Sequence, residues 1–125
     1  TFDTLNPFVV RGLPVPGARS YVWETLMQRS YDEPFTLYPQ VAAGLEVPDD
    51  RAWVIFHIDR RARFSDGRPV TAEDVRFSYE LLRERGRPNH RTYFRKVARV
   101  DLIDSHTIRF DLSGAADREL PMILG

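Results

Sequence analysis

Apolar and polar residues alternate most regularly near the end of the chain, over residues 107–112. A two-residue period is typical of a strand with one buried face. Residues 97–103 carry a matching apolar face, and the polar segment 104–106 separates the two runs. We therefore predict an antiparallel hairpin, whose second strand directs three side chains inward: Ile108, Phe110 and Leu112.

A second hairpin is predicted in the middle of the chain, where residues 45–47 and 53–58 flank the segment 48–51. This segment has the chemistry of a turn, because Pro48 presets the backbone dihedral and aspartates bond back to nearby amides. Both faces of the second strand are largely apolar, so we expect it to be covered on both sides. The two faces consist of Val54, Phe56 and Ile58, and of Trp53, Ile55 and His57.

The pattern of residues 72–85 predicts an amphipathic helix. Thr71 is suited to be its N-cap, and Asp74 stands three residues further on, in the capping-box position. Gly86 is the expected C′ residue that stops the helix, and Pro88 is expected to prevent it from resuming. The apolar stripe consists of Val75, Tyr79 and Leu82, widened by Phe77 and Leu81.

The N-terminal third gives a less regular pattern. Residues 1–16 are predicted to be extended and irregular, because proline and glycine interrupt them repeatedly. Residues 18–28 contain neither proline nor glycine and show a usable apolar face, which predicts a helix. We expect residues 30–38 to form a short edge strand or extended arm, and residues 39–44 a helical turn or loop.

Three shorter elements complete the expected fold. Residues 64–67 form a tight turn in which Gly67 supplies a positive backbone angle. Residues 90–96 are expected to form a short helix, and residues 117–124 an apolar helix or loop. Two hairpins and a long helix indicate the α+β class: a small antiparallel sheet of two hairpins with helices on one side.

Composition excludes several functional classes and agrees with the fold predicted from the pattern. The 125 residues, 42% hydrophobic and 29% charged, suit one globular domain. Eighteen basic residues balance eighteen acidic ones, so no overall field attracts nucleic acid or an anionic membrane. The absence of cysteine excludes disulfides and thiol catalysis. No apolar run is long enough to insert into a membrane.

Candidate catalytic or metal-binding groups do not form a recognisable constellation. The histidines lack metal-ligand spacing, and His57, in the middle of a strand, is expected to be hydrogen-bonded in or beside the core. There is no nucleophile elbow and no glycine-rich phosphate loop. We therefore predict no catalytic residue, no metal, no cofactor and no enzymatic activity. The cluster of Arg60, Arg61, Arg63 and Arg68 alternates with acidic residues, which favours a solvated face over a nucleic-acid site.

The irregular leader offers the one candidate binding segment. Residues 11–14 are expected to present backbone donors and acceptors that no local partner uses, and Gly12 would let another chain approach closely. An ordinary ordered loop is the alternative interpretation of the same residues.

Several motifs together carry a family resemblance. Residues 64–78 read F-S-D-G-R-P-V-T-A-E-D-V-R-F-S, residues 3–8 read D-T-L-N-P-F, and residues 24–26 read E-T-L. In these motifs the chain resembles the family 5 extracellular solute-binding proteins, the peptide, dipeptide and nickel receptors of ABC importers. Residues 32–36 and 118–121 resemble the branch of Yej-type peptide and microcin C receptors. Asp59 departs from the family pattern, in which a basic residue is usual, and Arg60 is expected to take over.

The resemblance implies part of a two-lobe fold of the periplasmic-binding-protein-like II type. Residues 1–28 would form the N-terminal part of lobe I, with the cleft-lining leader and first helix. Residues 29–125 would form an antiparallel subdomain that includes the helix 72–85. The second lobe would be absent, and the start at Thr1 suggests a piece excised from a longer protein.

The resemblance also implies the function. The expected protein is a periplasmic oligopeptide receptor that delivers its ligand to the permease subunits of an ABC importer. Arg11, Gly12 and Leu13 match the segment that lines the cleft and meets the peptide through its backbone. The alternatives are the same family with another solute, such as a nickel chelate or a sugar, and an accessory domain of a non-transport enzyme.

Overall fold

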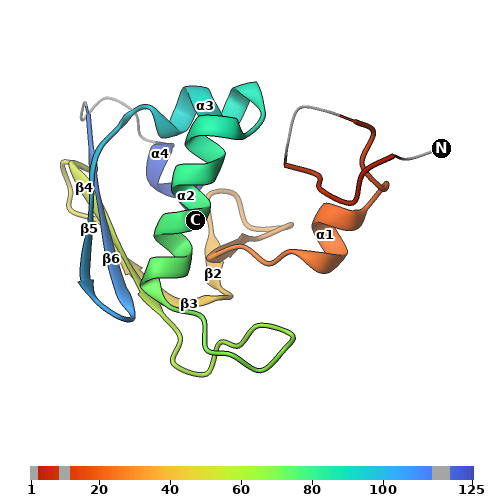
Figure 1. Cartoon of the computed structure of the whole chain (residues 1–125). Helices are drawn as coiled ribbons and strands as arrows, with labels where there is room; N and C mark the ends of the chain where they lie inside the picture. The colour runs from red at the N-terminus through yellow and green to blue at the C-terminus, as the bar shows by residue number, and fades with distance from the viewer. Residues whose placement is uncertain (1–2, 9–11, 114–118) are drawn as a thin grey trace.

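The computed structural model describes residues 3–8, 12–113 and 119–125. Its centre is a four-stranded antiparallel sheet in the order β3-β4-β6-β5, with the helices α2, α3 and α4 on one side (Figure 1). The α+β class predicted from the pattern is confirmed. The strands are β3 (Ala42–Glu46), β4 (Trp53–Ile58), β5 (Val97–Asp104) and β6 (Thr107–Leu112); the helices are α2 (Ala72–Arg85), α3 (Pro88–Phe94) and α4 (Leu120–Leu124).

Both predicted hairpins are present, and β4 pairs with β6 to join them into one sheet. The turn of the first hairpin closes through the amide of Arg51, which donates to the carbonyl of Pro48 at 2.9 Å. The prediction for residues 39–44 is wrong, because β3 begins at Ala42 and pairs there with Ile58. The small side chains of this stretch carry little strand propensity, and the pairing with β4 decides its conformation.

The inner face of the sheet and one side of α2 form the core. Phe56 and Phe110 pack edge to face with ring centroids 6.0 Å apart, and Tyr79 of α2 meets Phe110 at 5.3 Å. The outer face of β4 is only half-buried, so the expectation that the strand is covered on both sides is wrong for the described residues. Arg109 lies over the ring of Trp53 on this outer face, with Cζ 4.8 Å from the centroid.

Helix α2 begins and ends at the residues that the sequence predicts. The Asp74 carboxylate accepts a hydrogen bond from the Thr71 amide at 2.8 Å, as expected of a capping box, and a second bond from the Thr71 hydroxyl, also at 2.8 Å. Tyr79 is buried, whereas Phe77 is 65% exposed. Two residues correspond to about 200° of rotation around a helix, so Phe77 points away from the face that Tyr79 buries. The predicted widening of the stripe by Phe77 and Leu81 is therefore wrong.

The junction between α2 and α3 depends on Gly86. Its backbone is extended (φ −68°, ψ 175°), so it does not stop the helix through the left-handed conformation common at this position. Glycine is needed for space instead, because a Cβ atom would collide with the carbonyl oxygen of Leu82. Pro88 opens α3 at its first position rather than preventing a new helix. The short helix predicted over residues 90–96 therefore starts two residues earlier.

The N-terminal part departs most from prediction. The helix α1 (Ala18–Val22) is shorter than the predicted helix over residues 18–28, and β1 (Met27–Arg29) pairs with β2 (Leu37–Pro39) in a separate two-stranded sheet. The side chain of Met27 is buried, and its amide donates to the carbonyl of the last residue at 3.0 Å. These tertiary contacts outweigh the local helical pattern. Of the edge strand or extended arm predicted over residues 30–38, only Leu37 and Tyr38 lie in a strand, β2, and residues 31–35 form bends and a turn, so that prediction is right only at its end.

Candidate functional site

The candidate site is the leader, by which we mean residues 3–8 and 12–17. It forms a loop that closes on itself beside the four-stranded sheet and the helices α2, α3 and α4, which we call the body (Figure 1). The amide of Asp3 donates to the carbonyl of Leu13 at 3.0 Å, and the amide of Leu13 donates to the Asp3 carboxylate. The expectation that this backbone has no local partner is therefore wrong for Leu13, since both its polar groups are bonded within the leader.

The predicted ligand-binding residues are placed only in part. Arg11 lies outside the described residues. Gly12 is exposed with φ +90°, and a Cβ atom there would press on the Asp3 carboxylate and the Thr4 methyl group. Glycine is thus required by the closure of the leader itself. The side chain of Leu13 is 65% exposed and remains available to a ligand.

Arg87, between α2 and α3, attaches the leader to the body. Its amide donates to the carbonyl of Phe8 at 3.1 Å, and its Nε donates to the carbonyl of Pro7 at 2.9 Å. The Phe8 ring packs edge to face on Trp23, with centroids 5.7 Å apart. Sequence reasoning missed this role, because nothing local in Gly86-Arg87-Pro88 points to a partner 80 residues away.

His90 on α3 lies beneath this contact. Its ring is 9% exposed, with centroids 6.4 Å from Phe8 and 5.8 Å from Phe94. No described group hydrogen-bonds its Nδ1. Burial lowers the pKa of His90, and the positive charges of Arg19 and Arg87 lower it further, so the ring is neutral near pH 7.

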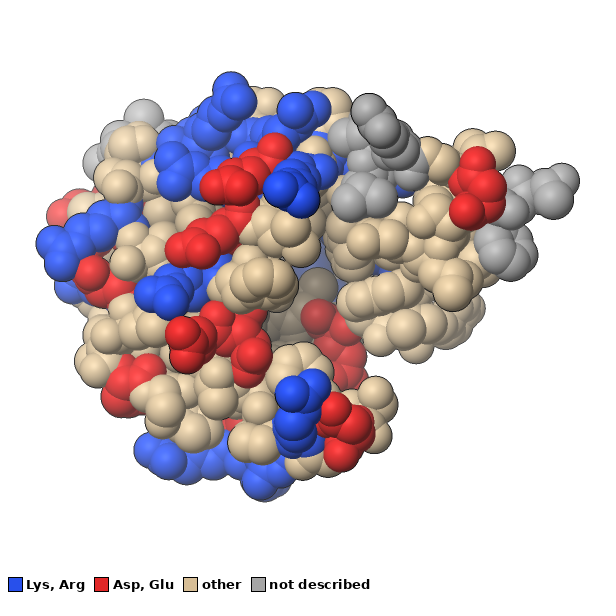
Figure 2. All heavy atoms as spheres, viewed as in Figure 1, with Lys and Arg blue, Asp and Glu red and all other residues tan. Residues whose placement is uncertain are grey.

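An apolar groove of about 440 Å³ lies between the leader and α1. None of the residues of α1 is buried, and Tyr21 is 90% exposed. Figure 2 shows a separate hollow in the surface, between the side of the molecule that holds the leader and the body. The groove is lined mainly by Leu5, Val15, Pro16, Tyr21, Val22 and Trp23.

The other side chains that could take part in catalysis or metal binding are bonded within local structure instead. Asp104, Ser105 and His106 form the turn between β5 and β6, where Ser105 Oγ lies 2.9 Å from His106 Nδ1. Asp104 accepts from the backbone amide of His106 and from the Thr107 hydroxyl, and these bonds lower the pKa of Asp104. The carboxylate therefore stabilises the turn rather than orienting the imidazole as a catalytic triad requires. His57 bonds Glu46 at 2.6 Å on the outer face of the sheet, as predicted for a histidine beside the core.

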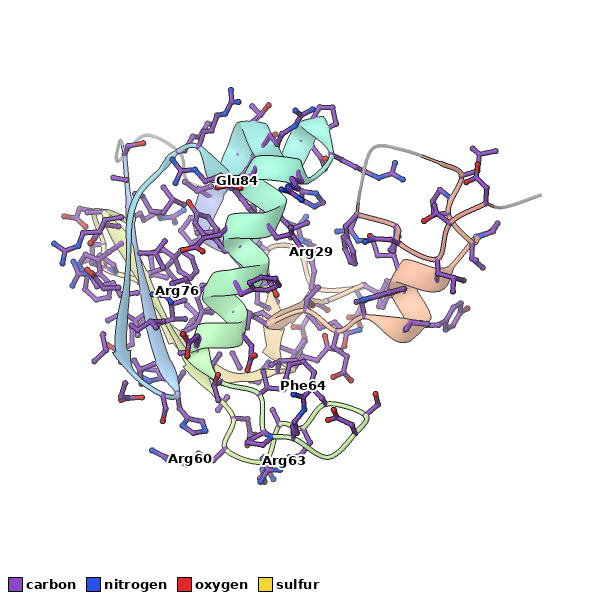
Figure 3. All side chains as sticks on the ribbon, in the orientation of Figure 1. Arg29, Arg60, Arg63, Phe64, Arg76 and Glu84 are labelled. Atoms are coloured by element: carbon purple, nitrogen blue, oxygen red, sulfur yellow. The ribbon has the colours of Figure 1, made fainter. Side chains whose placement is uncertain are left out.

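The arginine cluster forms an exposed loop, as predicted. Figure 3 shows Arg60 and Arg63 on the loop between β4 and α2. Arg61 pairs with Asp59 and Arg68 with Asp66, each at 2.8 Å. The hydrogen bonds from the Arg61 side chain and amide lower the pKa of Asp59 to about 2.

Within the described ranges, no group of three or more histidine, aspartate or glutamate residues could hold a metal ion. Among the helices that the structure describes, none has the length and apolarity needed to cross a membrane.

The fold matches that of two-lobe periplasmic binding proteins. NikA from Brucella suis superimposes with a TM-score of 0.74 at 21% identity, over 89% of this chain and 22% of its own. Residues 36–125 match the family described as "Bacterial extracellular solute-binding proteins, family 5 Middle". The chain belongs to this family.

Two curated relatives come from Agrobacterium fabrum. The "Peptidoglycan-binding protein YepA" is 41% identical over 99% of this chain and 21% of its own length. The "Probable peptide-binding protein YejA" is 37% identical over 100% of this chain and 20% of its own length. The chain therefore spans about a fifth of the length of these relatives.

Proposed function

We propose that this chain is the N-terminal part of a periplasmic receptor that captures a peptide and delivers it to the permease subunits of an ABC importer. Membership of the solute-binding family is the observation that carries the proposal. The relatives YepA and YejA are named for peptidoglycan and peptide binding, which supports a peptide-containing solute. The rest of the receptor would supply the second lobe and close over the solute.

In this proposal, residues 1–28 belong to lobe I and residues 29–125 form the antiparallel subdomain. Arg11, Gly12 and Leu13 line the cleft. Because the amide and carbonyl of Leu13 bond Asp3, the peptide would meet the Leu13 side chain and the backbone of Gly12 rather than a free strand edge at Leu13. The closed leader is a preformed surface, which reduces the entropy lost on binding.

A different solute is the main alternative, since NikA was crystallised with Fe(III)-EDTA. Capture of a peptide and capture of another solute can be distinguished with a thermal-shift panel on the full-length protein that contains this chain. The panel contains short peptides, muropeptides, a nickel chelate and sugar acids. A ligand at a hundred times its Kd stabilises the folded protein by about 2.7 kcal/mol. We expect this shift with peptides or muropeptides. A shift with only the chelate or a sugar acid would contradict peptide capture, and turnover of a solute would contradict a transport role.

A further inference from the structure

The strand β5 forms one edge of the four-stranded sheet (Figure 1). Within the described residues it has a strand partner on one side only, which is β6. The register with β6 shifts between Val97 and Arg99 and again between Leu102 and Asp104, whereas residues 99–102 pair regularly. This regular stretch leaves the outer edge of the sheet open to a further strand.

The polar backbone groups of Val100 point away from β6. The amide of Leu112 donates to the carbonyl of Ala52, which precedes β4, at 2.8 Å. Hydrogen-bonding directions alternate along a strand, so Phe110, two residues earlier and paired with Val54, also bonds toward β4. Val100 stands opposite Phe110 in the pair of β5 and β6. Its amide and carbonyl therefore face the open edge, where an added strand can bond them.

Charges on the outer face of this edge alternate both along the strands and across them. Along β5, the Arg99 guanidinium pairs with the Asp101 carboxylate at 2.8 Å. Across the sheet, Arg99 stands opposite Asp111, and Asp101 stands opposite Arg109. Arg109 and Asp111 pair in turn within β6, at 2.7 Å. The side chains of Arg99 and Asp101 are 71% and 35% exposed, so both are accessible from the edge.

This edge is complementary to itself. If two copies of β5 lie antiparallel about a twofold axis at Val100, Arg99 of each copy stands opposite Asp101 of the other. The alternation of charge then continues from one sheet into the next, and on the inner face the partly buried Val100 meets its counterpart. Charges on an edge strand oppose pairing with most strands, because like charges directly opposite destabilise a pair. The order of Arg99 and Asp101 favours this one arrangement instead.

We infer that the edge of β5 is an interaction surface for a second copy of this chain, and that the two copies join their sheets into one continuous sheet. The backbone of Val100 bonds its counterpart, and the contacts of Arg99 with Asp101 between the copies fix the register. A short strand edge buries little surface, so the association is weak and depends on concentration. The inference goes beyond the proposed function, because the leader takes no part in it.

Charge reversal tests this surface in the full-length protein that contains this chain. The measurement is sedimentation equilibrium over a range of concentrations at low ionic strength, where exposed charges are least screened. We expect a monomer–dimer equilibrium for wild type. Arg99→Asp places only negative charges at the axis and Asp101→Arg only positive ones, so each variant should dimerise at least about tenfold more weakly. The control Arg60→Asp, at an exposed arginine between β4 and α2, should leave the equilibrium unchanged (Figure 3).

An equimolar mixture of Arg99→Asp and Asp101→Arg gives the sharpest test. Opposite charges face one another again in the mixed pair, so a heterodimer should form more tightly than either variant forms with itself. Its formation also shows that both variants are folded. Wild type that stays monomeric at every concentration, a dimer insensitive to both reversals, or a mixture that stays monomeric would each overturn the surface. The solute panel does not depend on these outcomes, so peptide capture and self-association can fail separately.

Discussion

The attachment of the leader through Arg87 leads to a prediction about local stability. The substitution Arg87→Met keeps the apolar stem of the side chain but removes the guanidinium that bonds Pro7. The amide of residue 87 can still donate to the carbonyl of Phe8, so one of the two hydrogen bonds between residue 87 and the leader remains. We expect the leader to detach from the body more often, while the sheet is unaffected.

The expected loss of free energy follows from the one hydrogen bond that the substitution removes. A hydrogen bond with a charged donor contributes about 1.5–3 kcal/mol, and the half-buried position of Arg87 places its bond below this range, at about 1 kcal/mol. A loss of ~1 kcal/mol corresponds to roughly a fivefold change in an equilibrium constant.

Amide hydrogen exchange measures this equilibrium directly. The amide of residue 87 is bonded to the leader, so its exchange reports each detachment. It should exchange about fivefold faster in Arg87→Met than in wild type. The amides of β4 and β6 should be unchanged, and the matched variant Arg60→Met should alter neither. Unchanged exchange at residue 87, or faster exchange throughout the sheet, would refute the reasoning.

Three further predictions concern the body. Asp74→Ala removes both bonds to Thr71 and should cost about 1 kcal/mol in urea unfolding; an unchanged midpoint would show that the capping box contributes nothing. Tyr79→Phe removes the buried bond from the hydroxyl to the carbonyl of Phe94 at 3.0 Å and should cost about 1–2 kcal/mol, with the change in unfolding midpoint as the measure. Folding lowers the pKa of His90. As the pH falls through the ordinary histidine range, the unfolded chain therefore binds a proton at this ring more readily than the folded protein does, and the free energy of unfolding decreases. His90→Gln should therefore lose less stability than wild type between about pH 8 and pH 5; equal losses would contradict the burial of a neutral ring.

The body of the fold follows from local sequence signals. Thr71 and Asp74 mark the start of α2, the alternation in residues 107–112 marks β6, and the polar turns mark both hairpins. In each case the local pattern and the tertiary packing favour the same conformation, so the prediction holds.

The N-terminal part could not be predicted in the same way. Residues 18–28 have a helical pattern, but the helix ends at Val22, and Met27 pairs with β2 and bonds the last residue of the chain, both distant in sequence. The attachment of the leader likewise depends on Arg87, whose two bonds involve carbonyls of residues 7 and 8. Backbone carbonyls carry no sequence signal, since every residue has one. Arg11, Gly12 and Leu13 are indicated by the irregular pattern of residues 11–14 as well as by the family resemblance, and their part in binding remains a proposal.

The central claim, that the leader contacts the solute, is tested most directly by calorimetry on the full-length protein. The ligand is the peptide or muropeptide that the thermal-shift panel identifies. The variant is Leu13→Ser, and the control is Ile103→Ser, since both side chains are exposed aliphatics (65% and 55%) and Ile103 lies in β5. Burying a leucine against a ligand contributes about 1.5–3 kcal/mol, so Leu13→Ser should weaken binding by roughly tenfold or more and Ile103→Ser should not change it. Equal affinity of wild type and Leu13→Ser would contradict the claim.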